Sequence, residues 1–198
     1  MSMKFCILAS GSSGNCALLQ SAGTRVLVDA GFSPRKTSQL LAACGESLER
    51  IEAIFVTHEH GDHAALVAGL NRHPHIQVFA NASTARTLQS RLDFKVNWQL
   101  FETGARFRFR DLEVESFSVP HDAQDPVGFL FSAGAGDLFS PLRRLAWLTD
   151  LGHCPQHIHE RIREVEILVV EPNHCAELLK ADTKRPWPLK QRIGGRHG

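Results

Sequence analysis

Tyrosine is absent from this sequence of 198 residues, and methionine occurs only twice. Long hydrophobic runs are also missing. None approaches the roughly 18 apolar residues of a membrane-spanning helix, and the early run from Phe5 to Ala9 is too short for a signal peptide. The five cysteines are odd in number, widely spaced and never arranged as C-x-x-C, which argues against a disulfide framework and a cysteine zinc site. We therefore expect free thiols and a cytoplasmic protein with no membrane partner.

A strong net charge is missing as well. The 22 Lys and Arg residues nearly cancel the 21 Asp and Glu residues, so the formal net charge of +1 gives no general attraction to nucleic acid or membranes. The charge is uneven, because the segment from Lys180 onward carries +5 and the preceding residues carry −4. This basic tail is either a solvated surface or a rim that meets phosphate groups. A hydrophobic share of 43% predicts one globular domain over residues 1–198.

Short runs of β-branched and aliphatic residues alternate with helical patterns along the chain. The predicted strands are Phe5–Leu8, Ala17–Gln20, Arg25–Asp29, Ala53–Val56, Gln77–Ala80, Arg106–Phe109, Leu112–Ser118, Val127–Ser132, Leu145–Thr149 and Ile167–Val170. The predicted helices are Ser33–Cys44, His63–Asn71, Ser83–Leu92 and Pro155–Glu164. Early hairpins followed by strand–helix alternation indicate a layered α/β protein with a mixed sheet or sheets. The Gly- and Ala-rich segment from Ala133 to Pro141 is predicted to be a loop.

Histidine is abundant, with eleven copies, and three of them fall in one short run. An apolar strand ends at the sequence Thr57-His58-Glu59-His60-Gly61-Asp62-His63. His58 and His60 are two residues apart, so an extended chain presents them on the same side. Asp62 and His63 begin the next predicted helix and can face a second point nearby. Because imidazole and carboxylate groups suit Zn²⁺, Mn²⁺ and Fe²⁺, this run can supply halves of two metal sites.

Further candidate ligands stand where other predicted strands end. His121 follows the strand Leu112–Ser118, and Asp150 follows the strand Leu145–Thr149. A carboxylate can bridge two cations about 3.5–4 Å apart, and Asp150 suits that role, although a helix N-cap is its default reading. Asp29 is interpreted as a carboxylate behind the ligands or as a turn former. Glu171 can orient a ligand imidazole through the free N–H of the ring.

These motifs together resemble the metallo-β-lactamase superfamily of dinuclear metallohydrolases, through the run H-x-H-x-D-H followed by His121 and Asp150 in that order. Four further segments narrow the resemblance to the bacterial YycJ/WalJ-type subfamily, whose members are described as 5′-to-3′ DNA exonucleases: Ala9–Asn15, Val28–Gly31, Glu171–His174 and Lys190–Ile193. The resemblance covers nearly the whole chain. It implies the four-layer αββα sandwich of that superfamily.

The resemblance also implies a ligand set. It assigns His58, His60 and His121 to one metal ion, Asp62 and His63 to the other, and Asp150 to the bridge between them. In such proteins the last ligand is a late histidine in a Gly-His-Leu-Ser-Asn-like motif. We therefore expect this chain to lack its closing segment, which would carry that ligand.

Two divalent cations can lower the pKa of a bound water to about 7 and neutralise charge on a phosphoryl oxygen. The expected function is thus a dinuclear phosphodiesterase, an exonuclease acting on DNA by metal-activated hydroxide attack. Asp62 can accept the water proton, and His174 can contact a phosphate or protonate the leaving oxygen. The candidate substrate-binding residues are Ser12, Asn15, Asn173 and Arg192. Two alternatives remain: a thioester or lactam hydrolase on the same centre, and a catalytically silent metal-binding interaction module.

Overall fold

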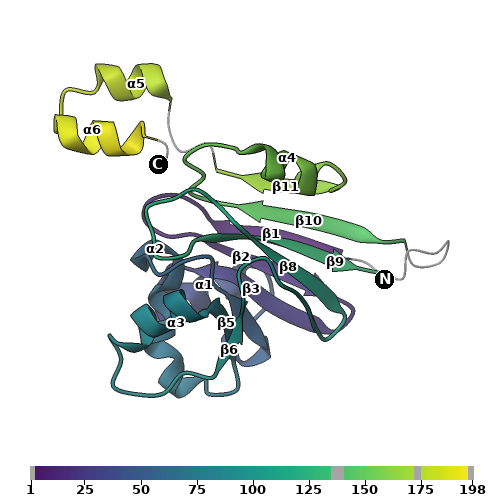
Figure 1. Ribbon diagram of the computed structural model, residues 1–198. Helices are drawn as coiled ribbons and strands as arrows, with labels where there is room; N and C mark the ends of the chain where they lie inside the picture. The colour runs from purple at the N-terminus through teal and green to yellow at the C-terminus, as the bar shows by residue number, and fades with distance from the viewer. Residues whose placement is uncertain (1–2, 135–140, 172–174, 196–198) are drawn as a thin grey trace.

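The structure is a computed structural model that describes residues 3–134, 141–171 and 175–195 (Figure 1). A mixed six-stranded sheet is built from the first half of the chain. Its strands, in spatial order, are β1 (Met3–Ala9), β2 (Cys16–Ser21), β3 (Thr24–Ala30), β4 (Ala53–Phe55), β5 (Gln77–Asn81) and β6 (Trp98–Phe101). The first three strands pair antiparallel, and β3 to β6 pair parallel. The parallel strands therefore end along the same edge of the sheet.

The second half of the chain forms a five-stranded sheet. Its strands, in the spatial order β11-β10-β9-β8-β7, are β7 (Arg106–Phe109), β8 (Leu112–Ser118), β9 (Val127–Ala133), β10 (Arg143–Leu148) and β11 (Ile167–Val170). All neighbours pair antiparallel except β10 and β11, which are parallel. This sheet is thus mixed as well.

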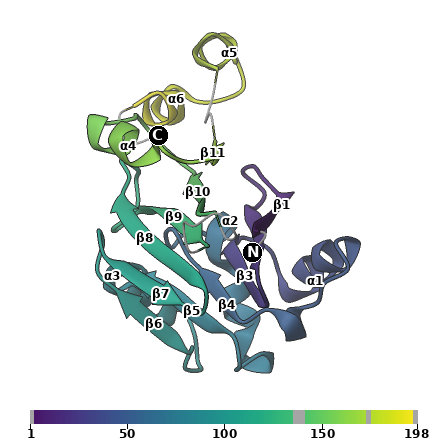
Figure 2. The same ribbon diagram turned by 90° about the vertical axis from the view of Figure 1, so that its right-hand side faces the viewer.

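Helices cover the outer faces of the two sheets (Figures 1 and 2). The helical segments are α1 (Pro34–Ala43), η1 (Leu48–Arg50), α2 (Gly61–Ala64), η2 (Ala65–Arg72), α3 (Ala82–Gln89), α4 (Gln156–Ile162), α5 (Ala176–Ala181) and α6 (Trp187–Ile193), where η marks a 3₁₀ helix. Side-chain caps fix two starts: Ser33 accepts from the Lys36 N–H, and Asn81 accepts from the Thr84 N–H. The predicted αββα sandwich is confirmed.

Three apolar clusters separate these layers. The cluster between the two sheets is rich in phenylalanine, and the ring of Phe55 stacks on Phe79 and meets Phe129 and Phe131 edge-on. A second cluster lies between the first sheet and α1, η2 and α3. A smaller third cluster joins the second sheet to Ile158 of α4. Near-continuous burial along the central strands, such as β3, β4 and β9, shows that both faces of each sheet are covered, as a four-layer protein requires.

The helix predicted over residues 63–71 is present, and it combines two helix types. The structure has one turn of α-helix, α2, followed by the 3₁₀ helix η2. Ala64, Val67 and Leu70 are all buried and three residues apart. A 3₁₀ helix has three residues per turn, so it places this set on one face, which an α-helix would spread over a wider arc. Among the described residues, no helix has the length and apolarity needed to cross a membrane.

Candidate metal centre

The segment from Thr57 to His63 leaves the end of β4 and crosses the edge where the parallel strands stop. It passes very close to the chain that follows β3. A Cβ added to Gly31 would lie 1.7 Å from the backbone oxygen of Asp62, so this close approach requires glycine. His60 then precedes α2 in an extended conformation and places Asp62 and His63 in its single turn. Local backbone packing thus fixes where the histidine run sits.

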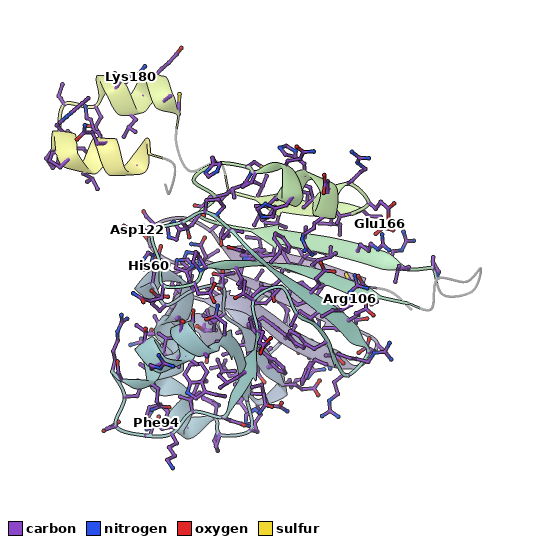
Figure 3. The ribbon with its side chains drawn as sticks, in the orientation of Figure 1. His60, Phe94, Arg106, Asp122, Glu166 and Lys180 are labelled. Atoms are coloured by element: carbon purple, nitrogen blue, oxygen red, sulfur yellow. The ribbon has the colours of Figure 1, made fainter. Side chains whose placement is uncertain are left out.

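Three imidazoles converge in one cluster, formed by His58, His60 and His121, which we call cluster one. Nε2 of His58 lies 3.0 Å from Nδ1 of His60, and that atom lies 3.2 Å from Nε2 of His121. Figure 3 shows His60 beside Asp122, the neighbour of His121 in sequence, although the two residues are 62 positions apart. Nitrogen ligands about 2.0–2.1 Å from a tetrahedral zinc ion are separated by about 3.4 Å, which is close to this spacing.

A second cluster, cluster two, consists of His58, His63 and Asp150. Oδ2 of Asp150 lies 2.8 Å from Nε2 of His63 and 3.7 Å from Nε2 of His58. His58 therefore belongs to both clusters. Asp62 flanks cluster two, because its Oδ2 is 3.7 Å from Nε2 of His63. The structure thus brings together all six residues that the sequence analysis assigned to metal binding.

Asp29 lies fully buried behind this centre and adopts a left-handed backbone conformation, with φ of 54°. Its carboxylate accepts hydrogen bonds from the backbone N–H of Thr57 at 2.9 Å and from Nε1 of Trp147 at 3.1 Å. Its Oδ2 also lies 2.9 Å from Nδ1 of His63. A carboxylate on Nδ1 fixes the ring orientation and leaves Nε2 directed at Asp150, as in the carboxylate–histidine–metal arrangement.

Burial and charge set the protonation of the clustered side chains. Burial, together with the charge of His63, lowers the pKa of His58 to about 2, so this imidazole is neutral and able to bind a cation. Burial opposes charge on His63 as well, but the carboxylates of Asp29 and Asp150 outweigh it and raise the pKa of His63 to about 10. Burial likewise opposes charge on Asp150, yet His63 lowers the pKa of that carboxyl to about 2. The carboxylates of Asp29 and Asp150 therefore stabilise a positive charge at this centre.

The donor set fits a divalent transition metal. Imidazole nitrogens and carboxylate oxygens are the ligands that such ions prefer. Oδ2 of Asp150 is buried and faces Nε2 of His63 at 2.8 Å and Nε2 of His58 at 3.7 Å. A buried carboxylate is costly unless a positive group faces it, and a protonated His63 or a bound cation can fill that role. Asp150 also has a left-handed φ of 51°, which directs the residue after β10 away from the strand path.

Asn15 and Ser12 were both predicted to bind substrate, and in the structure Asn15 is buried whereas Ser12 is exposed. Asn15 is buried, and its Nδ2 lies 3.0 Å from Nε2 of His63, while its backbone N–H donates to the Asp62 oxygen at 2.7 Å. Its Oδ1 accepts from the Gly11 N–H. Ser12 is exposed at the same loop. The loop therefore contacts the centre through Asn15 and presents Ser12 to the surface.

The remaining predicted site residues lie toward the end of the chain. Glu171 has a buried Oε2 with no hydrogen-bond partner among the described residues, and burial and the nearby charge of Asp150 raise its pKa. Its orienting role stays a prediction. Asn173 and His174 lie outside the described residues. Arg192 belongs to α6, but its side chain is outside the described part of the structure.

The sequence analysis missed three residues around the centre. Thr57 donates to Asp29, and its Oγ1 also lies 3.0 Å from Nδ1 of His58. Trp147 reaches Asp29 from the opposite sheet. Glu59 is buried between two ligand candidates and contacts the chain around His121. The position of Thr57 directly before the histidine run was a usable signal, whereas the contact of Trp147 depends on sheet packing.

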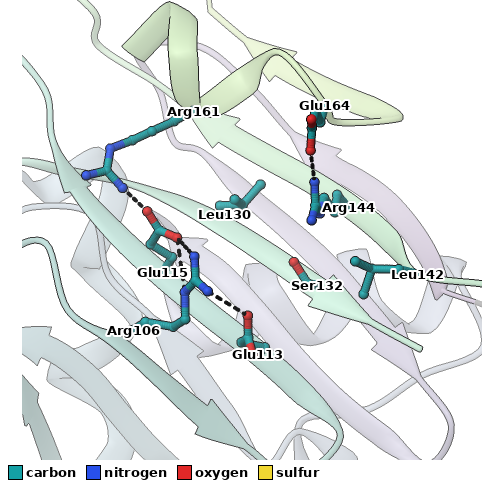
Figure 4. A pocket seen from close by; sticks show the side chains of 9 residues that line it. All are labelled: Arg106, Glu113, Glu115, Leu130, Ser132, Leu142, Arg144, Arg161 and Glu164. Carbon is teal, nitrogen blue, oxygen red and sulfur yellow. Dashed lines mark hydrogen bonds and ion pairs between the residues drawn. The ribbon is translucent and has the colours of Figure 1, made fainter. Parts of the chain in front are cut away.

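A polar cavity of about 290 Å³ lies elsewhere, on the outer face of the second sheet (Figure 4). Its charged groups are already paired with one another. Arg106 and Arg161 both contact Glu115, and Arg144 contacts Glu164 at 2.6 Å. These arginine and glutamate side chains of the cavity therefore neutralise one another.

Comparison with known proteins identifies relatives that share most of this chain. Residues 24–183 match the family described as the Beta-lactamase superfamily domain. Exodeoxyribonuclease WalJ from Streptococcus pneumoniae is 35% identical over 194 residues, which cover 96% of this chain and 69% of that protein. Exodeoxyribonuclease YycJ from Bacillus anthracis is 33% identical over 195 residues, which cover 98% of this chain and 71% of that protein.

Solved structures support the fold. Zinc-bound PqqB from Methylobacterium extorquens superposes with a TM-score of 0.67 at 19% sequence identity, covering 93% of this chain and 70% of that one. At this identity the likeness concerns the arrangement of the two sheets and their helices.

Proposed function

Because this chain belongs to the β-lactamase superfamily and, within it, to the group of WalJ and YycJ, we propose that it is a metal-dependent exonuclease acting on DNA. The observation that carries the proposal is the pair of clusters sharing His58. Three imidazole nitrogens converge in cluster one, and in cluster two the buried carboxylate oxygen of Asp150 faces two imidazoles, which is the donor set of a divalent metal site. The names of the two relatives support DNA as the substrate.

We assign the ligands as two sets joined by one bridge. His58, His60 and His121 would hold one ion, Asp62 and His63 would hold the other, and Asp150 would reach both. The short distances from Asp150 to His58 and His63 support the bridging role. Zn²⁺ and Mn²⁺ suit this donor set, and Fe²⁺ is a third candidate. When bound, such ions activate water for attack and neutralise charge on the phosphoryl group.

The protein's own residues orient this chemistry. Asp29 fixes the ring of His63, and Thr57 holds Asp29 in place with two donors. Asp62 is one-third exposed, so its carboxylate is open to solvent and able to accept the proton of the attacking water. Asn15 packs against His63 and the backbone of Asp62, which keeps the glycine-rich loop next to the centre.

Substrate binding is proposed for the exposed part of that loop and for the end of the chain. Ser12 is available at the surface for a phosphate oxygen. Asn173, His174 and Arg192 are proposed to contact the nucleic acid, with His174 near the leaving group. The basic tail begins at Lys180 near the end of α5 and includes α6, and in Figure 3 these helices lie on the same side of the picture as His60. Cationic side chains in this region would attract the phosphate backbone. We also propose a cytoplasmic location, since all five cysteines are free thiols.

A substrate panel tests the proposal. The purified chain, loaded with Mn²⁺ or Zn²⁺, is assayed on end-labelled single- and double-stranded DNA, on RNA and on a thioester. We expect nucleotides to be released from DNA ends, no release after chelation, and loss of release in Asp150→Asn. Hydrolysis of the thioester alone would overturn the nuclease assignment. Metal binding without turnover of any substrate would favour a silent interaction module instead.

A further inference from the structure

Glu59 lies at a bend between His58 and His60, and its carboxylate belongs to neither cluster. Its side chain is nevertheless buried, with 5% of the residue exposed. There Oε1 accepts a hydrogen bond of 2.9 Å from the backbone N–H of Gln124. Glu59 therefore connects the histidine run to the segment that carries His121.

That segment, residues 119–126, has no helix or strand of its own and is held by bonds to its surroundings. At its two ends, Val127 N–H donates to the Thr57 oxygen, and Gly152 N–H donates to the Pro120 oxygen. Near its far side, Asn81 and Thr103 donate to Asp125 at 2.6 and 2.8 Å. Glu59 joins this segment to the run containing His58 and His60, in addition to the direct contact between the rings of His60 and His121. The bond from Gln124 to Glu59 thus helps to hold His121 beside its two partners.

Glu59 is itself firmly placed. Nη1 of Arg91, which follows α3, donates to the backbone oxygen of Glu59 at 3.3 Å. The second carboxylate oxygen, Oε2, is buried with no hydrogen-bond partner among the described residues. An unsatisfied buried carboxylate oxygen costs about 1–3 kcal/mol or more, and a fold tolerates such a cost where a group has a positioning or functional task.

We propose that Glu59 is a positioning residue that sets the geometry of cluster one by fixing the His121 segment against His58 and His60. The inference rests on the proposed metal centre and names a determinant of its affinity. A residue that holds a ligand in place, without touching the ion, is expected to change metal affinity by about 10–100-fold when it is removed. It need not change the affinity of cluster two to the same degree, because His63 and Asp150 are held by Asp29 and β10.

Titration with Co²⁺ alone, followed by its visible absorption, tests the inference on the whole chain. Glu59→Gln keeps an oxygen that can accept from the Gln124 N–H, whereas Glu59→Leu removes it. Glu166→Ala is the matched control, because Glu166 also accepts a backbone N–H, that of Arg144, far from the centre in Figure 3. We expect Glu59→Leu to weaken one binding phase by about 10–100-fold and to alter its spectrum. Glu59→Gln and Glu166→Ala should match the wild type.

Three outcomes overturn the inference, and they are distinguishable. Wild-type protein that binds no Co²⁺ removes the metal centre and the positioning role together. Equal affinities and spectra in wild type and Glu59→Leu remove the positioning role alone. If Glu59→Leu does not fold, hydrogen exchange on the wild type decides: the Gln124 amide must be protected, and exchange at the rate of an open loop overturns the inference.

Discussion

Among single residues, Asp150 is the one on which the proposed metal centre depends most directly. Its Oδ2 is buried 2.8 Å from Nε2 of His63 and 3.7 Å from Nε2 of His58, so one carboxylate oxygen reaches both imidazoles. Asn has nearly the same shape but no charge, so Asp150→Asn should leave the fold intact and remove the bridge. We expect turnover on DNA to fall by more than about 100-fold, since even residues behind the ligands are worth 10–100-fold. Circular dichroism checks the fold, and wild-type turnover in the variant would take Asp150 out of the centre.

The charge on His63 leads to a prediction about pH in the metal-free protein. Asp29 and Asp150 raise the pKa of His63 from 6.5 to about 10 in the folded state, despite the opposing effect of burial. A group with a raised folded pKa stabilises the fold fully below its unfolded pKa and loses that contribution as pH rises through the folded value. We expect the Tm of metal-free protein to fall between about pH 6.5 and 10.

The control for this effect is Asp29→Asn, which removes one of the two carboxylates that raise the pKa of His63. The variant should be less stable at neutral pH, and its Tm should depend less steeply on pH over the same window. Thermal melts in a chelating buffer provide the comparison. A wild-type Tm that is flat, or that has the same slope as the variant, would contradict the ion pair.

At the scale of elements, the loop after β3 and the run before α2 must nearly touch. Gly31 allows this because a side chain there would overlap the backbone of Asp62. We expect Gly31→Ala to destabilise the protein by about 1–3 kcal/mol or more and to weaken metal binding, since relief of the clash displaces the histidine run. Gly23→Ala is a matched control in the β2–β3 turn, where an added Cβ meets nothing within 4 Å. Denaturant unfolding of both variants measures the difference, and equal stabilities would contradict the close approach.

Most strands could be predicted from the sequence because their apolar runs are buried on both sides. Leu145, Ala146 and Trp147 of β10, for example, are all buried between layers. The strand β6 was missed for the opposite reason: it has only four residues, and Leu100 is 62% exposed, so it carries no clear pattern. The helices α5 and α6 were also missed, since they are short and none of the side chains described in them is buried. Local pattern thus finds elements with a clear apolar run, including the edge strand β11, and misses short elements that lack one.

At the scale of the whole molecule, the packing of the two sheets decides which site residues could be predicted from the sequence and which could not. The histidine run was readable because six consecutive residues, 58–63, carry four potential ligands, counting Asp62. His121 and Asp150 were placed through strand ends and a family resemblance, and the two sheets bring both to the run. The contact between Trp147 and Asp29, 118 positions apart, follows from the packing of one sheet on the other. No local pattern encodes such a contact. The division of residues 1–198 into a single domain stays a prediction.

The layers also determine which cysteines can react. Cys16 is fully buried in the first sheet, and burial raises the pKa of its thiol. Cys44, Cys154 and Cys175 are exposed. We expect iodoacetamide to modify the three exposed thiols in the native protein and to reach Cys16 only after denaturation. Mass spectrometry of the peptides identifies the labelled residues. Fast native labelling of Cys16 would contradict the packing of the first sheet.

The most direct test of the central claim is the number of divalent ions that the chain binds at equilibrium, measured by mass spectrometry after dialysis against Mn²⁺ or Zn²⁺. Because His58 belongs to both clusters, its removal should affect both sites at once. We predict about two ions per chain for the wild type and fewer than about one for His58→Ala. A wild type that binds none, or a variant that binds as many ions as the wild type, would contradict a centre built around His58.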